Sequence, residues 1–271
     1  MKLSIITINY NNRVGLEKTV KSVQSQTWRD FEWIIIDGGS TDGSKDVIES
    51  LPSNLVTYRC SEPDKGIYNA MNKGIVKAGG EYLQFPNSGD SYNNSEALDI
   101  VIPQLQGNDI YYGNCHCVGG VRDFTMHYPQ ELSLAFFLHS SIGHPSSFIK
   151  RELFSNRNYR EDLHIVSDWA MFFQWFIEKK SFYYIDNTIV DYDYCGISST
   201  NVERCNFERR IVISDMFGEK TNDYISQVLN DRKELELYRI YNLKPILDSV
   251  CKNRYMSKLF SATLRFFRLF S

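Results

Sequence analysis

Long apolar runs are missing from this 271-residue chain, which has no stretch near the roughly 18 consecutive apolar residues of a membrane-spanning helix. Its first apolar run, Leu3–Ile8, is too short for the core of a signal peptide and leads directly into polar Asn9. The net charge is only −3, so no excess of basic residues indicates nucleic-acid binding. These absences predict a cytoplasmic protein without a nucleic-acid partner.

Three recognisable binding patterns are also missing. Neither a Walker phosphate loop nor the Gly-x-Gly-x-x-Gly dinucleotide fingerprint follows the first apolar run. The six cysteines are scattered, which is typical of reduced thiols in a cytoplasmic protein. Cys115-His116-Cys117 has the composition of a zinc site, but no second ligand pair follows at finger-like spacing. A chance cluster on a strand is the preferred interpretation.

Apolar runs alternate with helical patterns in the first hundred residues. Between the runs, Leu16, Val20 and Val23 share one helical face, and Ile67 to Ala78 carries an apolar stripe that Gly79-Gly80 ends. This alternation predicts an α/β fold with a Rossmann-like, mostly parallel sheet covered by helices on both faces. The expected strands are Leu3–Ile8, Phe31–Ile36, Leu55–Cys60 and Tyr82–Phe85.

The alternation fades beyond about residue 100. The expected elements there are a strand at Asp109–Tyr112, helices at Glu131–Leu138 and Ser167–Glu178, and one or two strands in Phe182–Tyr194. From Val202 to Leu247 the pattern is mostly helical. We therefore predict one domain over residues 1–200, with halves 1–100 and 101–200, followed by a helical extension over 201–271.

Polar and acidic residues follow each of the first four expected strands. In an open α/β sheet, ligands bind beyond the carboxyl ends of the strands, so these side chains are expected to converge there. Each has a structural alternative: Asp37 can close a turn and Asp64 can cap a helix. Asp90 after Gly89 suits Mg²⁺ or Mn²⁺, which take carboxylate oxygens together with substrate phosphates.

Four ordered stretches together resemble the signatures of family 2 glycosyltransferases, over roughly residues 1–200. They are Ser4–Asn11, Ile35–Gly43, Asp64–Gly74 and Asn87–Asp90. The resemblance implies a GT-A fold and transfer of a sugar, with inversion, from a nucleotide-diphosphate sugar. Uridine is the commoner nucleoside in this family.

The resemblance also carries roles to individual residues. It implies nucleoside recognition by Thr7, Asn9, Asp37 and Asp64, a place near the donor for Lys73, and a Mn²⁺ or Mg²⁺ ion on Asp90. One departure stands out: the family's metal triplet usually holds two adjacent acids, whereas this chain has Ser88-Gly89-Asp90. One protein carboxylate would then hold the metal with help from the donor.

Two later stretches, Gly143–Phe148 and Val166–Trp169, are similar to the family's acceptor-side motifs. Asp168 aligns with the catalytic base, which inverting displacement needs to take the acceptor proton. His144 and Trp169 would lie on the acceptor side. Locally, Asp168 can also cap the helix that follows it, and a single His is more often a structural hydrogen-bonding group.

Two other functions are weighed against sugar transfer. A sugar-phosphate nucleotidylyltransferase needs a glycine- and arginine-rich phosphate loop, where this chain has Asn9–Arg13. A non-catalytic protein that keeps the fold and binds a carbohydrate or another subunit is supported by the missing acid at Gly89.

The last twenty residues differ from the rest of the chain. Residues 252–271 hold five basic residues and no acid, and on a helix four of the five form a stripe beside an apolar face. This pattern is typical of an interfacial helix on anionic lipid, although a helix docked on the domain would also fit. We expect contact with the inner face of the cytoplasmic membrane and a lipid-linked saccharide as acceptor, as in cell-envelope polysaccharide synthesis.

Overall fold

The computed structural model describes residues 2–120 and 122–218. The first half forms four parallel strands with β1 in the middle, hydrogen-bonded to β2 on one side and β4 on the other. Every residue of β1 is buried, as expected for a strand covered on both faces. The four strands are β1 (Leu3–Asn9), β2 (Phe31–Asp37), β3 (Tyr58–Ser61) and β4 (Tyr82–Gln84).

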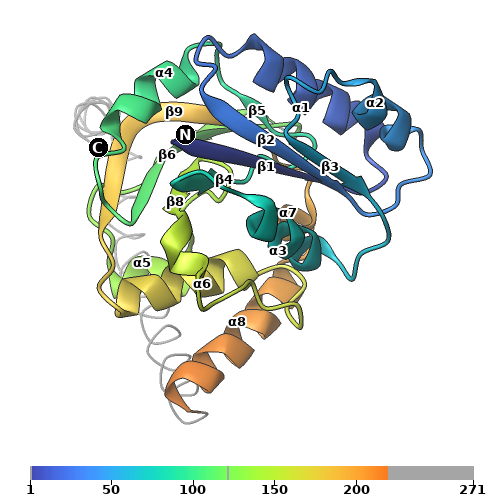
Figure 1. Ribbon diagram of the computed structural model, residues 1–271. Coiled ribbons are helices and arrows are strands. Elements are labelled where there is room, and N and C mark those ends of the chain that lie inside the picture. The colour runs from blue at the N-terminus through green and yellow to red at the C-terminus, as the bar shows by residue number, and fades with distance from the viewer. Residues whose placement is uncertain (1, 121, 219–271) are drawn as a thin grey trace, which may run out of the picture. The chain divides into compact units, whose positions relative to one another are not determined.

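Helices cover both faces of this parallel part. Figure 1 shows α1 (Arg13–Ser25) and α2 (Ser44–Ser50) on one face and α3 (Ile67–Lys77) on the other. Gly74 lets α3 approach the sheet closely, because a Cβ there would lie 2.5 Å from Cγ2 of Ile6.

Antiparallel pairings take over in the second half of the sheet. The strand order is β3-β2-β1-β4-β8-β6-β9-β5, and β7 pairs with β6. β8 runs antiparallel to both β4 and β6, while β6 and β9 are parallel. The strands are β5 (Ser91–Tyr92), β6 (Ile110–Val118), β7 (Phe124–Met126), β8 (Ser147–Lys150) and β9 (Phe182–Asp193).

The remaining helices follow β4 in the chain. Many aromatic side chains of the second half are buried, and Trp169 stacks on Phe173 within α6 at 5.3 Å between ring centroids. Core packing therefore explains much of the high aromatic content. The helices are α4 (Ala97–Val101), α5 (Leu134–His139), α6 (Ser167–Ile177), α7 (Ile197–Thr200) and α8 (Val202–Phe217), with 3₁₀ turns at Ile102–Gln104 and Arg151–Phe154.

The short strand β5 returns the chain to the far end of β9. Ser91 pairs with Asp191 and Tyr92 with Val190 in antiparallel register. The loop before β5, which contains Gly89 and Asp90, is thereby held against the carboxyl end of β9. This pairing joins the two halves of the sheet at the site described below.

The predicted α/β class and the parallel arrangement of the first strands are confirmed. β5, β7 and β8 were not expected, and β6 extends six residues beyond the predicted strand to include Cys115 and Cys117. Cys115, His116 and Cys117 therefore lie on a strand, as the preferred interpretation of this cluster expects.

Residues up to Arg209 form one compact unit, and residues from Arg210 onward belong to a second. The structure describes this second unit only as far as Gly218, and the predicted domain boundary at residue 200 stays a prediction. The basic segment 252–271 lies outside the described residues. Within the described part of the chain, none of the helices has the length and apolar character to cross a membrane.

Candidate active site

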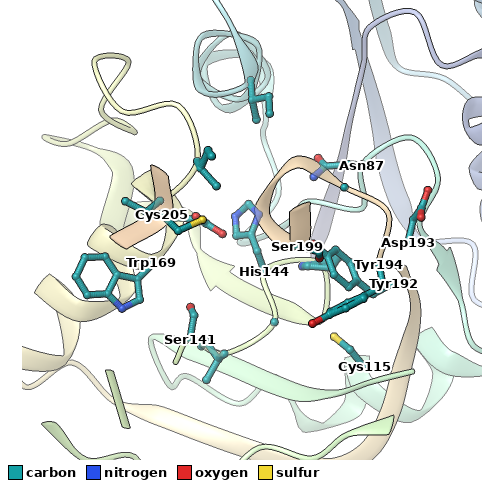
Figure 2. Close-up of a pocket in the computed structure, with 18 of the residues that line it drawn as sticks. Asn87, Cys115, Ser141, His144, Trp169, Tyr192, Asp193, Tyr194, Ser199 and Cys205 are labelled. Carbon is teal, nitrogen blue, oxygen red and sulfur yellow. The ribbon is translucent and has the colours of Figure 1, made fainter. Parts of the chain in front are cut away.

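A cavity of about 680 Å³ opens where the two halves of the sheet meet. Its walls come from α3, the loop after β4, the loop before β8, the start of α6, the end of β9 and α8. In Figure 2, His144 lies between Asn87 and Asp193 on one side and Trp169 and Cys205 on the other. Of the predicted site residues, Asp90, His144, Asp168 and Trp169 line this cavity.

Asp90 is almost completely buried, with 3% of its surface exposed, and both carboxylate oxygens are oriented by backbone N–H groups. The N–H of Asn87 donates to Oδ2 at 3.0 Å, and the N–H of Asp193 donates to Oδ1 at 3.1 Å. The carboxylate is therefore fixed between the β4–β5 loop and the end of β9. Nearby, Nζ of Lys18 donates to the carbonyl of Gly89 at 2.9 Å.

The protonation of Asp90 is set mainly by its burial. Burial raises the pKa of this carboxyl to about 7; the negative charge of Asp193 adds to the rise, and the two backbone donors oppose it. A cation beside the carboxylate would favour its ionised form, since opposite charges stabilise each other. A divalent cation bound beside Asp90 would therefore lower this raised pKa.

The side chains around Asp90 fit a hard divalent cation. Oδ1 of Asn87, in the same wall of the cavity, is buried and has no hydrogen-bond partner among the described residues. Carboxylate and amide oxygens are the ligands that Mg²⁺ and Mn²⁺ prefer. The described residues contain no cluster of three or more acidic, His or Cys side chains, so substrate oxygens or water would fill the other coordination positions of a cation bound here.

Asp168 lies in the first turn of α6, half-buried at the cavity wall. The hydroxyl of Tyr68, on α3, donates to its Oδ1 at 2.9 Å and to the backbone carbonyl of Ile165 at 2.6 Å. Asp168 makes no N-cap hydrogen bond of its own, since the residue at the N-cap position is Val166. The carboxylate is therefore oriented by a buried tyrosine on another helix.

His144 is a buried member of an aromatic cluster. Its ring stacks on Phe85 at 4.9 Å, and its Nε2 lies 2.8 Å from the hydroxyl of Tyr159. Burial lowers the pKa of His144, and the nearby charge of Asp168 only partly offsets this. A neutral imidazole that lines the cavity can orient a substrate hydroxyl, but its ring contacts also give it a structural role.

Trp169 and Arg209 form the wall next to Asp168. The indole N–H donates to the carbonyl of Phe137 at 2.7 Å, and the guanidinium of Arg209 lies 4.8 Å from the centre of the indole ring. Burial lowers the pKa of Arg209, and its Nε has no hydrogen-bond partner among the described residues. This places a positive charge with an unused donor at the cavity wall next to Asp168.

The residues predicted to recognise the nucleoside lie at the ends of β1, β2 and β3, outside the cavity wall. Asp37 is buried, and burial would raise its pKa, but hydrogen bonds from Ser40, Ser61 and Asn9 lower the pKa below its ordinary value. Oδ1 of Asn9 is buried without a partner in the described structure. An ionised carboxylate and an unused amide oxygen therefore meet at this edge.

The other predicted donor residues differ in how accessible they are. Thr7 is fully buried and its hydroxyl accepts a hydrogen bond from the indole of Trp33 at 3.0 Å. A Cβ on Gly38 would lie 2.5 Å from Oδ2 of Asp64, so Gly38 allows the ends of β2 and β3 to approach. Lys73 forms an ion pair with Glu62 at 2.9 Å, which raises the pKa of the lysine. Their roles in donor binding stay predictions.

Four residues of this region were not identified from the sequence: Tyr68, Asp193, Arg209 and Glu208. Tyr68 and Asp193 act on Asp168 and Asp90 from 100 and 103 residues away in the chain. Tyr68 lies within the quoted stretch Asp64–Gly74, but the sequence assigned it no role. No local pattern marks the other three.

A family model for glycosyl transferase family 2 matches residues 4–179, a span that contains Asp90 and Asp168. The chain belongs to this family. It is therefore a glycosyltransferase, and the sequence resemblance is confirmed.

Curated relatives of this glycosyltransferase come from several bacteria. An uncharacterised glycosyltransferase of Mycobacterium tuberculosis is 39% identical, but the match spans only 39% of this chain and 40% of that relative. A PGL/p-HBAD biosynthesis glycosyltransferase of Mycobacterium bovis is 28% identical over 79% of this chain and 86% of its own length. A GalNAc(5)-diNAcBac-PP-undecaprenol beta-1,3-glucosyltransferase of Campylobacter jejuni is also 28% identical, over 67% and 62%.

Solved structures show the same fold. Staphylococcus aureus TarS 1-349 superposes with a TM-score of 0.63 at 18% identity, covering 82% of this chain and 68% of that one. The mannosyltransferase PcManGT of Pyrobaculum calidifontis, in complex with GDP-Man and Mn²⁺, has a TM-score of 0.56 at 15% identity, covering 98% and 80%. The GT-A fold expected for this glycosyltransferase is confirmed.

Proposed function

We propose that this glycosyltransferase moves a sugar, with inversion, from a nucleotide-diphosphate sugar to an acceptor hydroxyl. The observation that carries the proposal is that one cavity holds two carboxylates with different surroundings, Asp90 and Asp168. Asp90 is buried and hydrogen-bonded by backbone groups, whereas Asp168 is half-buried and oriented by a hydroxyl. Two such environments suit two roles, cation binding and proton transfer.

Asp168 would act as the base. The acceptor oxygen attacks the anomeric carbon of the donor, the bond between that carbon and the diphosphate oxygen breaks, and the acceptor proton passes to a carboxylate oxygen of Asp168. A single displacement of this kind inverts the anomeric configuration. Tyr68 would keep the carboxylate pointed at the acceptor through its hydrogen bond to Oδ1.

Asp90 would hold a divalent cation, Mn²⁺ or Mg²⁺, with Asn87 Oδ1 beside it. When bound, such an ion neutralises the charge that builds on the departing diphosphate. Asp90 can bind the ion without moving, because backbone N–H groups on both sides fix its carboxylate. The buried setting also strengthens the attraction between the carboxylate and a cation.

The donor is proposed to be a uridine diphosphate sugar. Thr7, Asn9, Asp37 and Asp64 would recognise the nucleoside, and Lys73 would lie near the donor. TarS has been crystallised with UDP and with UDP-GlcNAc, and PcManGT with GDP-Man and Mn²⁺, which supports a nucleotide-diphosphate donor for proteins of this fold. The side-chain amide oxygen of Asn9 has no hydrogen-bond partner among the described residues, so it can accept a hydrogen bond from the base or the ribose of the nucleotide.

The acceptor is proposed to be a lipid-linked saccharide used in cell-envelope polysaccharide synthesis. The Campylobacter relative is named for an undecaprenol-diphosphate-linked saccharide, and the Mycobacterium relative for PGL/p-HBAD biosynthesis. Such an acceptor would agree with the basic segment 252–271 binding the inner face of the cytoplasmic membrane, close to the saccharide. His144 and Trp169 would then contact the acceptor sugar. Family membership favours transfer over nucleotidyl transfer or a purely binding role.

The test combines binding and turnover. Thermal unfolding of the protein is followed with UDP, GDP and other nucleoside diphosphates, each with and without Mn²⁺, and nucleoside diphosphate release is measured over a panel of nucleotide sugars. We expect UDP with Mn²⁺ to raise the unfolding temperature most and chelation to remove that increase. A panel in which no nucleotide stabilises the protein and no donor turns over would contradict the proposal.

A further inference from the structure

Gly89 occupies the position where the family usually has another metal-binding acid, and its surroundings explain why no side chain is present. Its φ is +110°, a conformation that residues with a Cβ rarely adopt. A Cβ built on Gly89 would lie only 2.9 Å from Oδ2 of Asp193, closer than real Cβ contacts come. The space that an acid at position 89 would use already contains a carboxylate.

The sheet register produces this overlap. β5 and β9 pair antiparallel, with Ser91 opposite Asp191. Continuing that register by two residues places Gly89 opposite Asp193, and the hydrogen bond from the N–H of Asp193 to Oδ1 of Asp90 fixes the alignment. The carboxylate of Asp193 therefore arrives beside Asp90 by backbone pairing.

The two oxygens of Asp193 have different surroundings. Oδ1 accepts a hydrogen bond from the N–H of Cys195 at 3.0 Å, which orients the carboxylate. Oδ2, the atom next to Gly89, accepts no hydrogen bond from the part of the chain that the structure describes. Asp193 also lines the cavity, as Asn87 and Asp90 do.

We propose that Asp193 is the second protein carboxylate of the divalent-cation site, replacing from β9 the acid that is absent at Gly89. This inference rests on the proposed function, because it assumes that a nucleotide-diphosphate donor and a cation bind beside Asp90. Two carboxylates and one amide oxygen leave several coordination positions for diphosphate oxygens and water, as Mg²⁺ and Mn²⁺ sites commonly do. The site would then hold two protein charges instead of one.

A purely structural role for Asp193 is the competing explanation. In that role the backbone N–H of Asp193 donates to Asp90, and Oδ1 accepts the hydrogen bond from the N–H of Cys195 in the turn that leads into α7. The charge on Oδ2 would then have no function. Replacing the carboxylate by an amide keeps the backbone N–H and an oxygen for the Cys195 N–H, so it separates the two explanations.

The experiment measures Mn²⁺ binding by the electron paramagnetic resonance signal of free Mn²⁺, in the presence of saturating UDP, or GDP if that nucleotide stabilises the protein more. We expect Asp193→Asn to weaken Mn²⁺ binding by about tenfold or more, as loss of a ligand or its close partner does. Asp191→Asn is the matched control, since Asp191 lies two residues earlier on the same strand and pairs with His116 outside the cavity. That control should bind Mn²⁺ as the wild type does.

A second variant guards against a folding artefact. Asp193→Glu keeps the charge while lengthening the side chain, so it should bind Mn²⁺ better than Asp193→Asn, with thermal unfolding measured for each variant. Two results overturn the inference and leave the proposed function intact. One is equal Mn²⁺ binding by the wild type and Asp193→Asn. The other is an equal loss of Mn²⁺ binding in Asp193→Asn and Asp193→Glu. Absence of nucleotide-dependent Mn²⁺ binding by the wild type overturns both.

Discussion

Asp168 depends on Tyr68 for its orientation. Tyr68 is buried, and its hydroxyl connects the carboxylate to the backbone of Ile165. Burial, followed by the negative charge of Asp168, holds the pKa of Tyr68 well above its ordinary value, so the hydroxyl stays protonated and donates. The tyrosine is a positioning residue, and Asp168 is the group that would meet the acceptor.

Replacing Asp168 by Asn removes the proton acceptor and leaves the cation site unchanged. We expect kcat for nucleoside diphosphate release to fall by about 10²- to 10⁴-fold, the usual contribution of a positioned base. Thermal stabilisation by UDP with Mn²⁺ should remain. Asp162→Asn, on the exposed loop before α6, is the control, and equal kcat values for the two variants would contradict the role of Asp168.

Tyr68→Phe removes one hydrogen bond to Asp168, the proposed base. We expect kcat to fall by about three- to tenfold, which corresponds to the net worth of a hydrogen bond. The KM for the donor should change little, because the hydroxyl of Tyr68 contacts Asp168 and none of the residues proposed to bind the donor. Tyr183→Phe, at a half-exposed tyrosine of β9, provides a control for loss of a hydroxyl. A change in KM without a change in kcat would show that Tyr68 has another role.

At the residue scale, the motifs identified Asp90 and Asp168 because each stands in a recognisable local pattern. Their partners Asp193 and Tyr68 could not be assigned in the same way, since each contact joins residues about a hundred positions apart. The missing acid at Gly89 was visible in the sequence. Its replacement depends on the register of β5 against β9, which a two-residue strand does not reveal.

At the scale of elements, the loop before α6 is held by one side chain of α8. Glu208 is 1% exposed, and its carboxylate accepts hydrogen bonds from the N–H groups of His164, Ile165 and Val166 and from Arg204. The backbone that leads to Asp168 is thereby fixed. Burial would raise the pKa of Glu208, but the donors outweigh it and lower the pKa below its ordinary value of 4.5.

Glu208→Gln should loosen this loop. We expect a loss of about 1–3 kcal/mol in the free energy of unfolding at neutral pH, because buried N–H groups lose a charged acceptor. Urea unfolding of the variant and of Glu203→Gln, at an exposed site on the same helix, measures the difference. The Glu203 variant should unfold as the wild type does.

The lowered pKa of Glu208 gives the sign of the pH dependence. Its contribution to stability is present above pH 4.5 and is lost as the pH falls through the lower folded-state pKa. The wild type should therefore lose its advantage over Glu208→Gln on acidification, which urea unfolding at a series of pH values would show. A constant difference between the two proteins down to strongly acidic pH would contradict this account.

Regular elements could be predicted from the sequence better than irregular ones. β1 and β2 are mostly apolar runs and α3 has a helical apolar stripe, and the predicted ranges agree with the structure to within one residue at each end. β5, β7 and β8 have two, three and four residues, too few to show a period, and they form through pairing with distant strands.

On the scale of the whole molecule, the sheet assembles one cavity from residues of both halves of the 1–209 unit. The fold class could be predicted because parallel strands and helices alternate early in the chain. The strand order of the antiparallel half could not be predicted, because β8 lies between β4 and β6 and so strands that are consecutive in the sequence are not neighbours in the sheet. The role of the basic segment 252–271 remains a sequence-based prediction.

Replacing the five basic residues of 252–271 by Gln should abolish binding to anionic vesicles. Each basic residue near such a surface contributes about 1 kcal/mol, so the loss should be large and the wild-type binding should weaken with salt. Cosedimentation with vesicles that contain phosphatidylglycerol, compared with pure phosphatidylcholine, measures it. Undiminished binding by the variant would contradict an electrostatic membrane contact.

The contact between Gly89 and Asp193 also has an evolutionary meaning. A side chain at position 89 and a carboxylate at position 193 compete for the same volume, so substitutions at the two positions should be correlated among homologous sequences. Descendants that regain an acid at 89 should carry a smaller residue at 193, and those with glycine at 89 should keep an acid on β9. A search that requires two adjacent acids would overlook such enzymes, although the charge has only moved to the neighbouring strand.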